Sequence, residues 1–177
     1  TLCHYNVFFG VDHEMNGQNM VDLGLIHGGE NIVYAGHSAG GLAAIIAASL
    51  DNNSGGVLGL DVTDTEGVPG VDDFIGRDYA SDVATLAFSL SGESSSCNSS
   101  NNGVYLFRMM TDYNAIKINS SDHCDFENPT DELCQISCEN TTGLFEDEDI
   151  RTIIKLLGTS SIMILTDLYT IETTPWS

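Results

Sequence analysis

A serine lies in a sequence context that favours nucleophilic chemistry. Ser38 is the centre of the pentapeptide Gly36-His-Ser-Ala-Gly40, which stands between the apolar runs Ile32–Ala35 and Leu42–Leu50. This order predicts a strand, a tight turn and a buried helix. Glycines on both sides let the strand and the helix approach closely, so the hydroxyl is held at the helix N-terminus. There the backbone N–H of Ala39 can help to bind an oxyanion. The alternative is a glycine-rich loop whose serine only caps the helix.

Two further side chains are expected at strand ends. Asp61 directly follows the apolar run Val57–Leu60, and His123 follows the last short strand, expected at Ala115–Ile118. In an open parallel sheet, active groups lie at the carboxyl ends of the strands. We therefore expect Asp61 and His123 near Ser38, as the groups of a nucleophilic acyl transfer.

The identity of the acid stays open among three carboxylates. Asp61 ranks first because it stands at a strand end, Glu93 ranks second because it follows the strand expected at 83–90, and Asp64 ranks third. Asp61 could instead be a turn residue that accepts backbone N–H bonds.

The histidine also has a competing interpretation. His123 could be an ordinary surface histidine in a polar loop. His37 neighbours the serine, but we expect the turn to point its ring elsewhere.

The order of elements predicts an α/β fold with a mainly parallel sheet flanked by helices. The expected strands are 6–12, 31–35, 57–60, 83–90 and 115–118, and the expected helices are 18–27, 42–50, 104–111 and 129–138. A further amphipathic helix opens at residues 146–149 with the apolar stripe Ile150, Ile153, Ile154 and Leu157, and the apolar tail from Gly158 is expected to pack.

Composition narrows the class of protein. The 177 residues are 42% hydrophobic, which suffices for a single domain over 1–177. Five Lys and Arg against 26 Asp and Glu give a formal net charge of −21, which excludes nucleic acid as a partner. No apolar run is long enough for a membrane span. The acid-rich segment 62–82 lacks the spacing of a calcium loop, so we expect a solvated excursion and no metal site.

Cysteines and glycosylation sequons indicate an oxidising compartment. We expect disulfides rather than zinc among Cys97, Cys124, Cys134 and Cys138, with Cys3 left as the odd thiol. A disulfide from Cys124, to Cys97 or Cys138, would fix the loop that carries His123. Candidate glycan acceptors are Asn52, Asn98, Asn119 and Asn140. These features predict a secreted or cell-surface glycoprotein.

Together the motifs resemble the α/β-hydrolase superfamily. They are Gly36-His-Ser-Ala-Gly-Gly41, Leu60-Asp-Val-Thr-Asp64, Gly92-Glu with Cys97-Asn, and Asp122-His-Cys-Asp125, in the chain order serine, acid, histidine. They look most like the chlorophyllase-like and platelet-activating-factor-acetylhydrolase-like branches. The resemblance implies a serine esterase that acts on a small-molecule or lipid-like ester and needs no cofactor.

The resemblance also implies a missing part. Members of this superfamily carry further strands, and a His-Gly-type loop that supplies the second oxyanion N–H, before the strand expected at Asn6. We interpret the chain as the C-terminal portion of a larger or two-chain domain, completed by a companion polypeptide. The alternative is a catalytically inactive hydrolase-fold glycoprotein with a structural or binding role.

Overall fold

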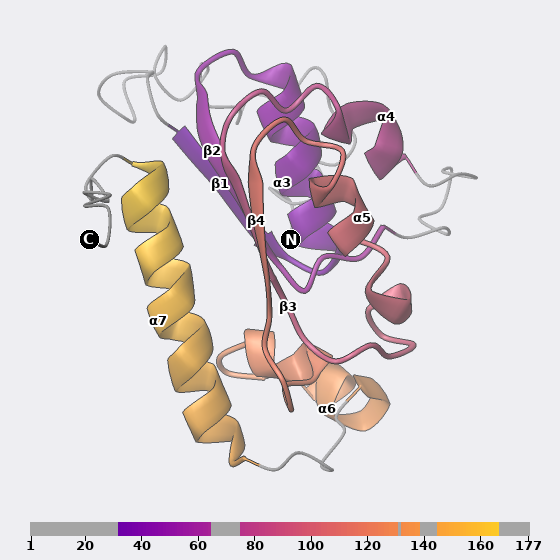
Figure 1. Cartoon of the computed structure of the whole chain (residues 1–177). Coiled ribbons are helices and arrows are strands. Elements are labelled where there is room, and N and C mark those ends of the chain that lie inside the picture. The colour runs from indigo at the N-terminus through magenta and orange to yellow at the C-terminus, as the bar shows by residue number, and fades with distance from the viewer. Residues whose placement is uncertain (1–31, 65–74, 131, 139–144, 167–177) are drawn as a thin grey trace, which may run out of the picture.

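The computed structural model describes residues 32–64, 75–130, 132–138 and 145–166. In this part of the chain, one sheet contains the parallel strands β1 (Ile32–His37), β2 (Ser54–Leu60), β3 (Ala87–Ser91) and β4 (Tyr113–Lys117), in that order. Figure 1 shows helices on both sides of this sheet. The expected α/β class with a parallel sheet is therefore confirmed. The strand expected at 6–12 and the helix expected at 18–27 lie outside the described residues.

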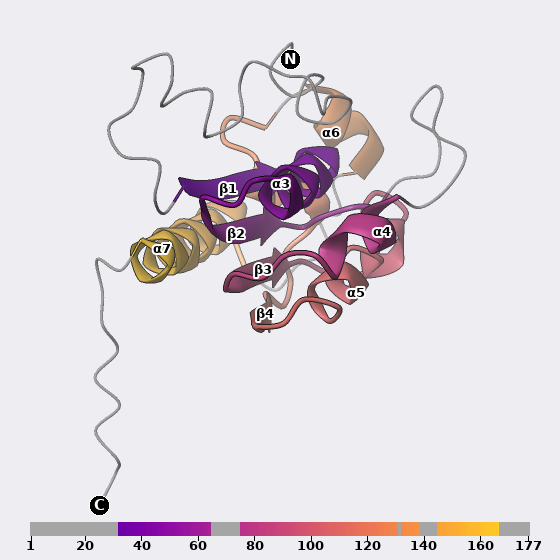
Figure 2. The same ribbon diagram turned by 90° about the horizontal axis from the view of Figure 1, so that it is seen from above.

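Two apolar clusters cover the two faces of the sheet. On one face, α3 (Ala39–Leu50), α4 (Gly76–Ala80) and α5 (Val104–Phe107) pack against side chains such as that of Val57. On the other face, the long helix α7 (Asp147–Leu165) packs against side chains such as that of Leu58. Figure 2 shows α7 and α3 on opposite sides of the sheet.

The position of β2 in the sheet explains why its sequence is almost entirely apolar. Its neighbours Val57 and Leu58 belong to different clusters, because successive side chains of a strand point to opposite faces. A parallel strand covered on both faces has no solvent side, so apolar residues replace the usual alternation.

The strand register fixes which strand ends meet. His37 on β1 lies beside Leu60 on β2, and Leu60 lies beside Leu90 on β3. The residues that follow these strands therefore gather at one edge of the sheet. The 3-10 helix η2 (His123–Phe126) and helix α6 (Glu132–Cys138) contact each other below this edge in Figure 1.

Several expected boundaries differ from the observed ones. The helix expected at 104–111 ends at Phe107, and the helix expected at 129–138 begins at Glu132. The segment 62–82 is more than a solvated excursion, since it contains α4. Gly76 begins α4, where a Cβ atom would meet the side chains of Leu106 and Leu42 at 2.7–2.8 Å. A polar, acid-rich sequence does not predict the close packing that glycine allows here.

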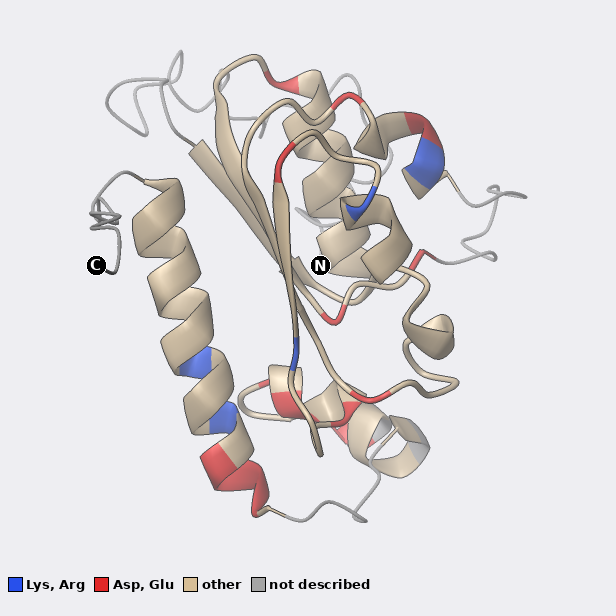
Figure 3. Cartoon of the chain, in the orientation of Figure 1, with Lys and Arg blue, Asp and Glu red and all other residues tan. Residues whose placement is uncertain are grey.

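Helix α7 joins two segments that the sequence pattern presents as separate. The helix runs through Gly158 to Leu165. The Leu165 side chain is buried, as expected for the apolar tail. Figure 3 shows acidic residues at its start, where Asp147, Glu148 and Asp149 complement the helix dipole. None of the helices in the described ranges is both long enough and apolar enough to cross a membrane.

Two glycines give a matched test of the packing. In Gly36→Ala the added Cβ would overlap the backbone of Gly40 and lie 2.7 Å from the Gly41 nitrogen. We expect the free energy of unfolding to fall by about 3 kcal/mol or more, because backbone atoms cannot move aside. In Gly158→Ala the Cβ lies 4.0 Å from Leu58 Cδ2, an ordinary contact. This helix-interior change should stabilise the protein by about 0.5–1 kcal/mol.

Urea denaturation followed by circular dichroism measures both effects. A Gly36→Ala variant as stable as the wild type would contradict the tight strand-to-helix turn.

Candidate active site

Ser38 occupies a strained turn between β1 and α3. Its backbone has φ 54° and ψ −127°, a conformation that costs a non-glycine residue roughly 1–3 kcal/mol. The turn is held by hydrogen bonds from Ser38 N–H to the Leu60 carbonyl (3.0 Å) and from Gly41 N–H to the Ser38 carbonyl (3.0 Å). The Ser38 side chain makes no helix-capping hydrogen bond. The strand, turn and helix are therefore as expected, and Ser38 stands at the N-cap position of α3 without the side-chain bond of a capping serine.

The Asp61 carboxylate is buried directly after β2. Asp61 is 1% exposed, and its backbone N–H donates to the Leu90 carbonyl at 2.7 Å. Asp61 Oδ1 accepts a hydrogen bond from the backbone N–H of Gly92 at 2.9 Å. Asp61 Oδ2 lies 2.7 Å from His123 Nδ1. The carboxylate therefore acts both as an acceptor for a turn and as a partner for the histidine.

His123 completes the arrangement from η2. The turn is a capping box in which Asp122 accepts from Asp125 N–H (3.3 Å) and Asp125 accepts from Asp122 N–H (2.9 Å). His123 is buried, so the surface-histidine alternative is wrong. Its Nε2 lies 3.1 Å from Ser38 Oγ.

The hydrogen-bond geometry suits one tautomer of the neutral His123 ring. An ionised carboxylate only accepts, so the Nδ1 that faces Asp61 carries the proton. Nε2 is then the acceptor for the Ser38 hydroxyl, which is the orientation a general base requires.

Two of the three candidate acids are engaged elsewhere. Glu93 pairs with Lys117 at 2.5 Å, and this hydrogen bond holds the pKa of Glu93 below its usual range. Asp64 Oδ1 accepts from the Gly76 N–H at 3.2 Å, and burial raises the pKa of Asp64. Within the described residues, the carboxylate bonded to His123 is that of Asp61, the first of the three in the sequence ranking.

The structure places Asn98, a predicted glycan acceptor, where its side chain is not available to a glycan in the folded chain. Its side chain is fully buried, and its Nδ2 donates toward both oxygens of Asp61. The polar sequence around Asn98 gives no signal of this role. Asn52 and Asn119 are exposed, while Asn140 lies outside the described residues.

His37 also differs from expectation. Its ring does not point away from the site, because the ring centroids of His37 and His123 are 4.5 Å apart. The His37 ring also stacks on Phe126 at 6.2 Å, and its Nδ1 lies 3.5 Å from Glu127 Oε1. The turn η2 and the residue after it thus fold over the end of β1, a contact between segments far apart in the sequence.

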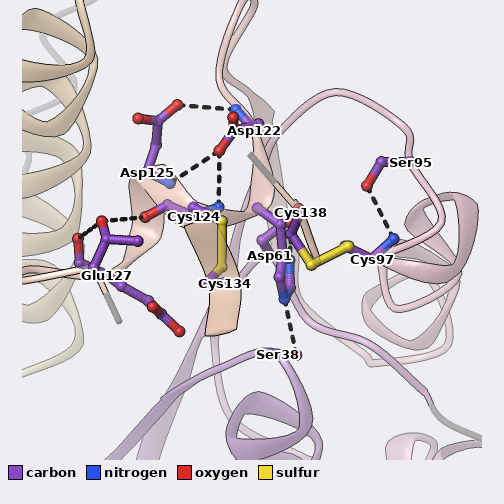
Figure 4. The surroundings of a disulfide bond; sticks show 12 residues. Ser38, Asp61, Ser95, Cys97, Asp122, Cys124, Asp125, Glu127, Cys134 and Cys138 are labelled. Carbon is purple, nitrogen blue, oxygen red and sulfur yellow. Dashed lines mark hydrogen bonds and ion pairs between the residues drawn. A yellow bond between two sulfur atoms is a disulfide. The ribbon is translucent and has the colours of Figure 1, made fainter. Parts of the chain in front are cut away.

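Two disulfides tie the loops of the site to α6. Cys124 pairs with Cys134, and Cys97 pairs with Cys138 (Figure 4). The expected bond from Cys124 to Cys97 or Cys138 is therefore wrong. Residues four apart share one face of a helix, so α6 presents Cys134 to the His123 turn and Cys138 to the Asn98 loop. These four cysteines are in disulfides rather than a zinc site, and Cys3 lies outside the described residues.

Comparisons with known proteins find similar solved structures at low sequence identity. No protein-family model matches this sequence, and no curated protein matches it. Among solved structures, Est1E from Butyrivibrio proteoclasticus superposes with a TM-score of 0.46 and 13% identity, over 81% of this chain and 68% of that chain. Est1E with bound ferulic acid gives a TM-score of 0.46 and 14% identity, over 81% of this chain and 66% of that chain.

Asp125, beside His123, makes the stability of this turn depend on pH. Burial raises the pKa of Asp125 to about 6, although Arg151 Nε lies 3.8 Å from its Oδ1. An unfolded aspartate has a pKa of about 3.9. Asp125 therefore contributes stability that is fully present below about pH 3.9 and is lost as the pH rises through about 6.

Asp125→Asn removes this dependence. Between pH 4 and pH 7 the wild type should lose up to about 2 kcal/mol of unfolding free energy relative to Asp125→Asn. Urea melts at both pH values measure the difference. Glu148→Gln, an exposed carboxylate of α7, controls for the loss of one negative charge. A stability difference between Asp125→Asn and the wild type that does not vary with pH would contradict the raised pKa of Asp125.

Proposed function

We propose that the protein is a serine carboxylic-ester hydrolase that acts through an acyl-enzyme. The observation that carries the proposal is the continuous chain of hydrogen bonds from Ser38 Oγ through His123 to Asp61, with distances of 3.1 and 2.7 Å. The serine lies on a strained turn and is half-buried, so a substrate can reach it. A nucleophile, a base and an orienting acid in this geometry are the parts of acyl transfer.

The proposed reaction has two steps. Ser38 Oγ attacks the ester carbonyl while His123 Nε2 takes the hydroxyl proton, and His123 then gives that proton to the leaving alcohol. In the second step water attacks the acyl-serine while His123 Nε2 takes a proton from it, and His123 then gives that proton to Ser38 Oγ as the carboxylic acid leaves. Asp61 stabilises the imidazolium that forms in both steps. No cofactor or metal takes part in this scheme.

Ala39 is the proposed first donor of the oxyanion hole. It begins α3, where the first N–H groups have no partner within the helix and the dipole favours negative charge. Hydrolases with this turn take a second N–H from a loop that precedes the nucleophile. Within the described residues, β1 is an end strand of the sheet, which leaves its outer edge for further strands. We propose that a companion polypeptide supplies such strands and the second donor.

The site geometry favours turnover over the alternative of an inactive glycoprotein with a structural or binding role. A strained serine and a buried aspartate–histidine pair both cost stability, which a purely structural role would not require. Two disulfides and the exposed sequons at Asn52 and Asn119 support a secreted or cell-surface location. The class of substrate, a small-molecule or lipid-like ester, and the chlorophyllase-like or acetylhydrolase-like branch are proposals that rest on the sequence motifs.

Covalent labelling tests the nucleophile. A fluorophosphonate probe should label the wild type and fail to label Ser38→Ala, because the probe reacts only with an activated serine. Ser49→Ala, on the same helix α3, should label like the wild type and is the matched control. Equal labelling of wild type and Ser38→Ala would overturn the proposal.

Asp61→Asn tests the acid. It should lower kcat for a p-nitrophenyl ester by roughly 10³–10⁴-fold, since the imidazole loses its tautomer and orientation.

A further inference from the structure

We propose that Asn98 is a positioning residue that holds the Asp61 carboxylate in the orientation that His123 needs; this inference rests on the proposed function. Asn98 Nδ2 lies 3.3 Å from Asp61 Oδ1, 3.1 Å from Asp61 Oδ2 and 2.7 Å from the Glu93 carbonyl oxygen. The amide has two N–H hydrogens. One serves the Glu93 carbonyl, and the two carboxylate oxygens share the other.

The remaining hydrogen-bonding capacity of Asn98 is used within its own loop. Its Oδ1 accepts from the backbone N–H of Ser95 (2.9 Å) and of Asn101 (3.1 Å). This pattern fixes the orientation of the amide, because the flipped form would place an oxygen against a carboxylate. A side chain that is 0% exposed and fully bonded leaves no room for a glycan on Nδ2.

The loop around Asn98 has a strained backbone. Three consecutive residues after it, Ser99, Ser100 and Asn101, have φ values of 47°, 60° and 60°. Non-glycine residues rarely adopt this conformation, and it persists only where the surroundings enforce it. Here the Asn98 side chain and the disulfide from Cys97 to Cys138 enforce it.

The donor of Asn98 acts on the acid and not on the substrate. Asp61 Oδ1 accepts from Gly92 N–H, and Asp61 Oδ2 faces His123. The Asn98 amide bridges the two oxygens, which restricts rotation of the carboxylate about its Cβ–Cγ bond. Loss of this restraint should affect kcat more than KM, because the acid stabilises the imidazolium only in the transition state.

Asn98→Asp distinguishes the role of the amide nitrogen from that of the amide oxygen. The retained oxygen still accepts from Ser95 and Asn101 N–H, while the bond to the Glu93 carbonyl is lost with the amide. The donor becomes a second carboxyl oxygen that faces Asp61. At low pH this pair shares a proton and the bridge is preserved, while at higher pH the two carboxylates repel each other.

We expect a distinct pH profile for Asn98→Asp. At pH 8 its kcat should fall by about tenfold or more, with KM changed by less than about twofold. The deficit should shrink as the pH falls and the shared proton returns. The low-field proton NMR signal of His123 Nδ1–H, which needs the bond to Asp61, should broaden with the same pH dependence in Asn98→Asp and stay sharp in the wild type. A role limited to loop structure predicts neither change.

Ser100→Gly is the matched control. It removes the sequon but keeps Asn98, and glycine suits the φ of 60° at this position. It should match the wild type in rate, pH profile and NMR signal. If Asn98→Asp does not accumulate as folded protein, Asn98→Ala decides the question through a lowered kcat and a broadened signal.

Two results would overturn the inference. One is a kcat and an Nδ1–H signal in Asn98→Asp that equal those of the wild type at pH 8. The other is a glycan on Asn98, detected by mass spectrometry of the protein secreted from a glycosylating host. An inactive wild type would remove the proposed function alone, since the NMR signal still decides whether Asn98 holds Asp61.

Discussion

The site depends on the burial of one carboxylate. Asp61 is 1% exposed, so its negative charge must be compensated by hydrogen-bond donors inside the protein. Three donors converge on it: the His123 Nδ1–H, the Gly92 backbone N–H and the Asn98 amide. The donors come from two segments, the loop after β3 and the turn η2, so folding must bring both to the end of β2 before the charge can be buried. The same requirement fixes the histidine beside Ser38.

The sheet and the disulfides meet this requirement in different ways. The register of β1, β2 and β3 brings the residues after each strand to one edge without any side-chain chemistry. The loops beyond this edge have no such register. Helix α6 compensates, because Cys134 and Cys138 bind it to the His123 turn and to the Asn98 loop. Covalent bonds thus hold the two donors whose positions the sheet does not define.

The sequence predicted the parts of the site that follow from strand order. Ser38, Asp61 and His123 were identified because each follows an apolar strand, and parallel strands end at a common edge. Asn98 could not be found in this way. Its role depends on a loop with a left-handed backbone, and a run of polar residues does not predict that conformation. The pairing of Cys124 depends on which face α6 turns toward the His123 turn. The spacing of the cysteines in the sequence does not determine that face.

The proposed reaction requires that Ser38 forms a covalent acyl intermediate. Mass spectrometry of the intact protein, quenched in acid soon after mixing with a slowly hydrolysed p-nitrophenyl ester, measures this directly. We expect a mass increase of one acyl group, mapped by peptide sequencing to Ser38 and lost over time as the ester is hydrolysed. An acyl group on another residue, or an unmodified protein that still turns over the ester, would contradict the claim.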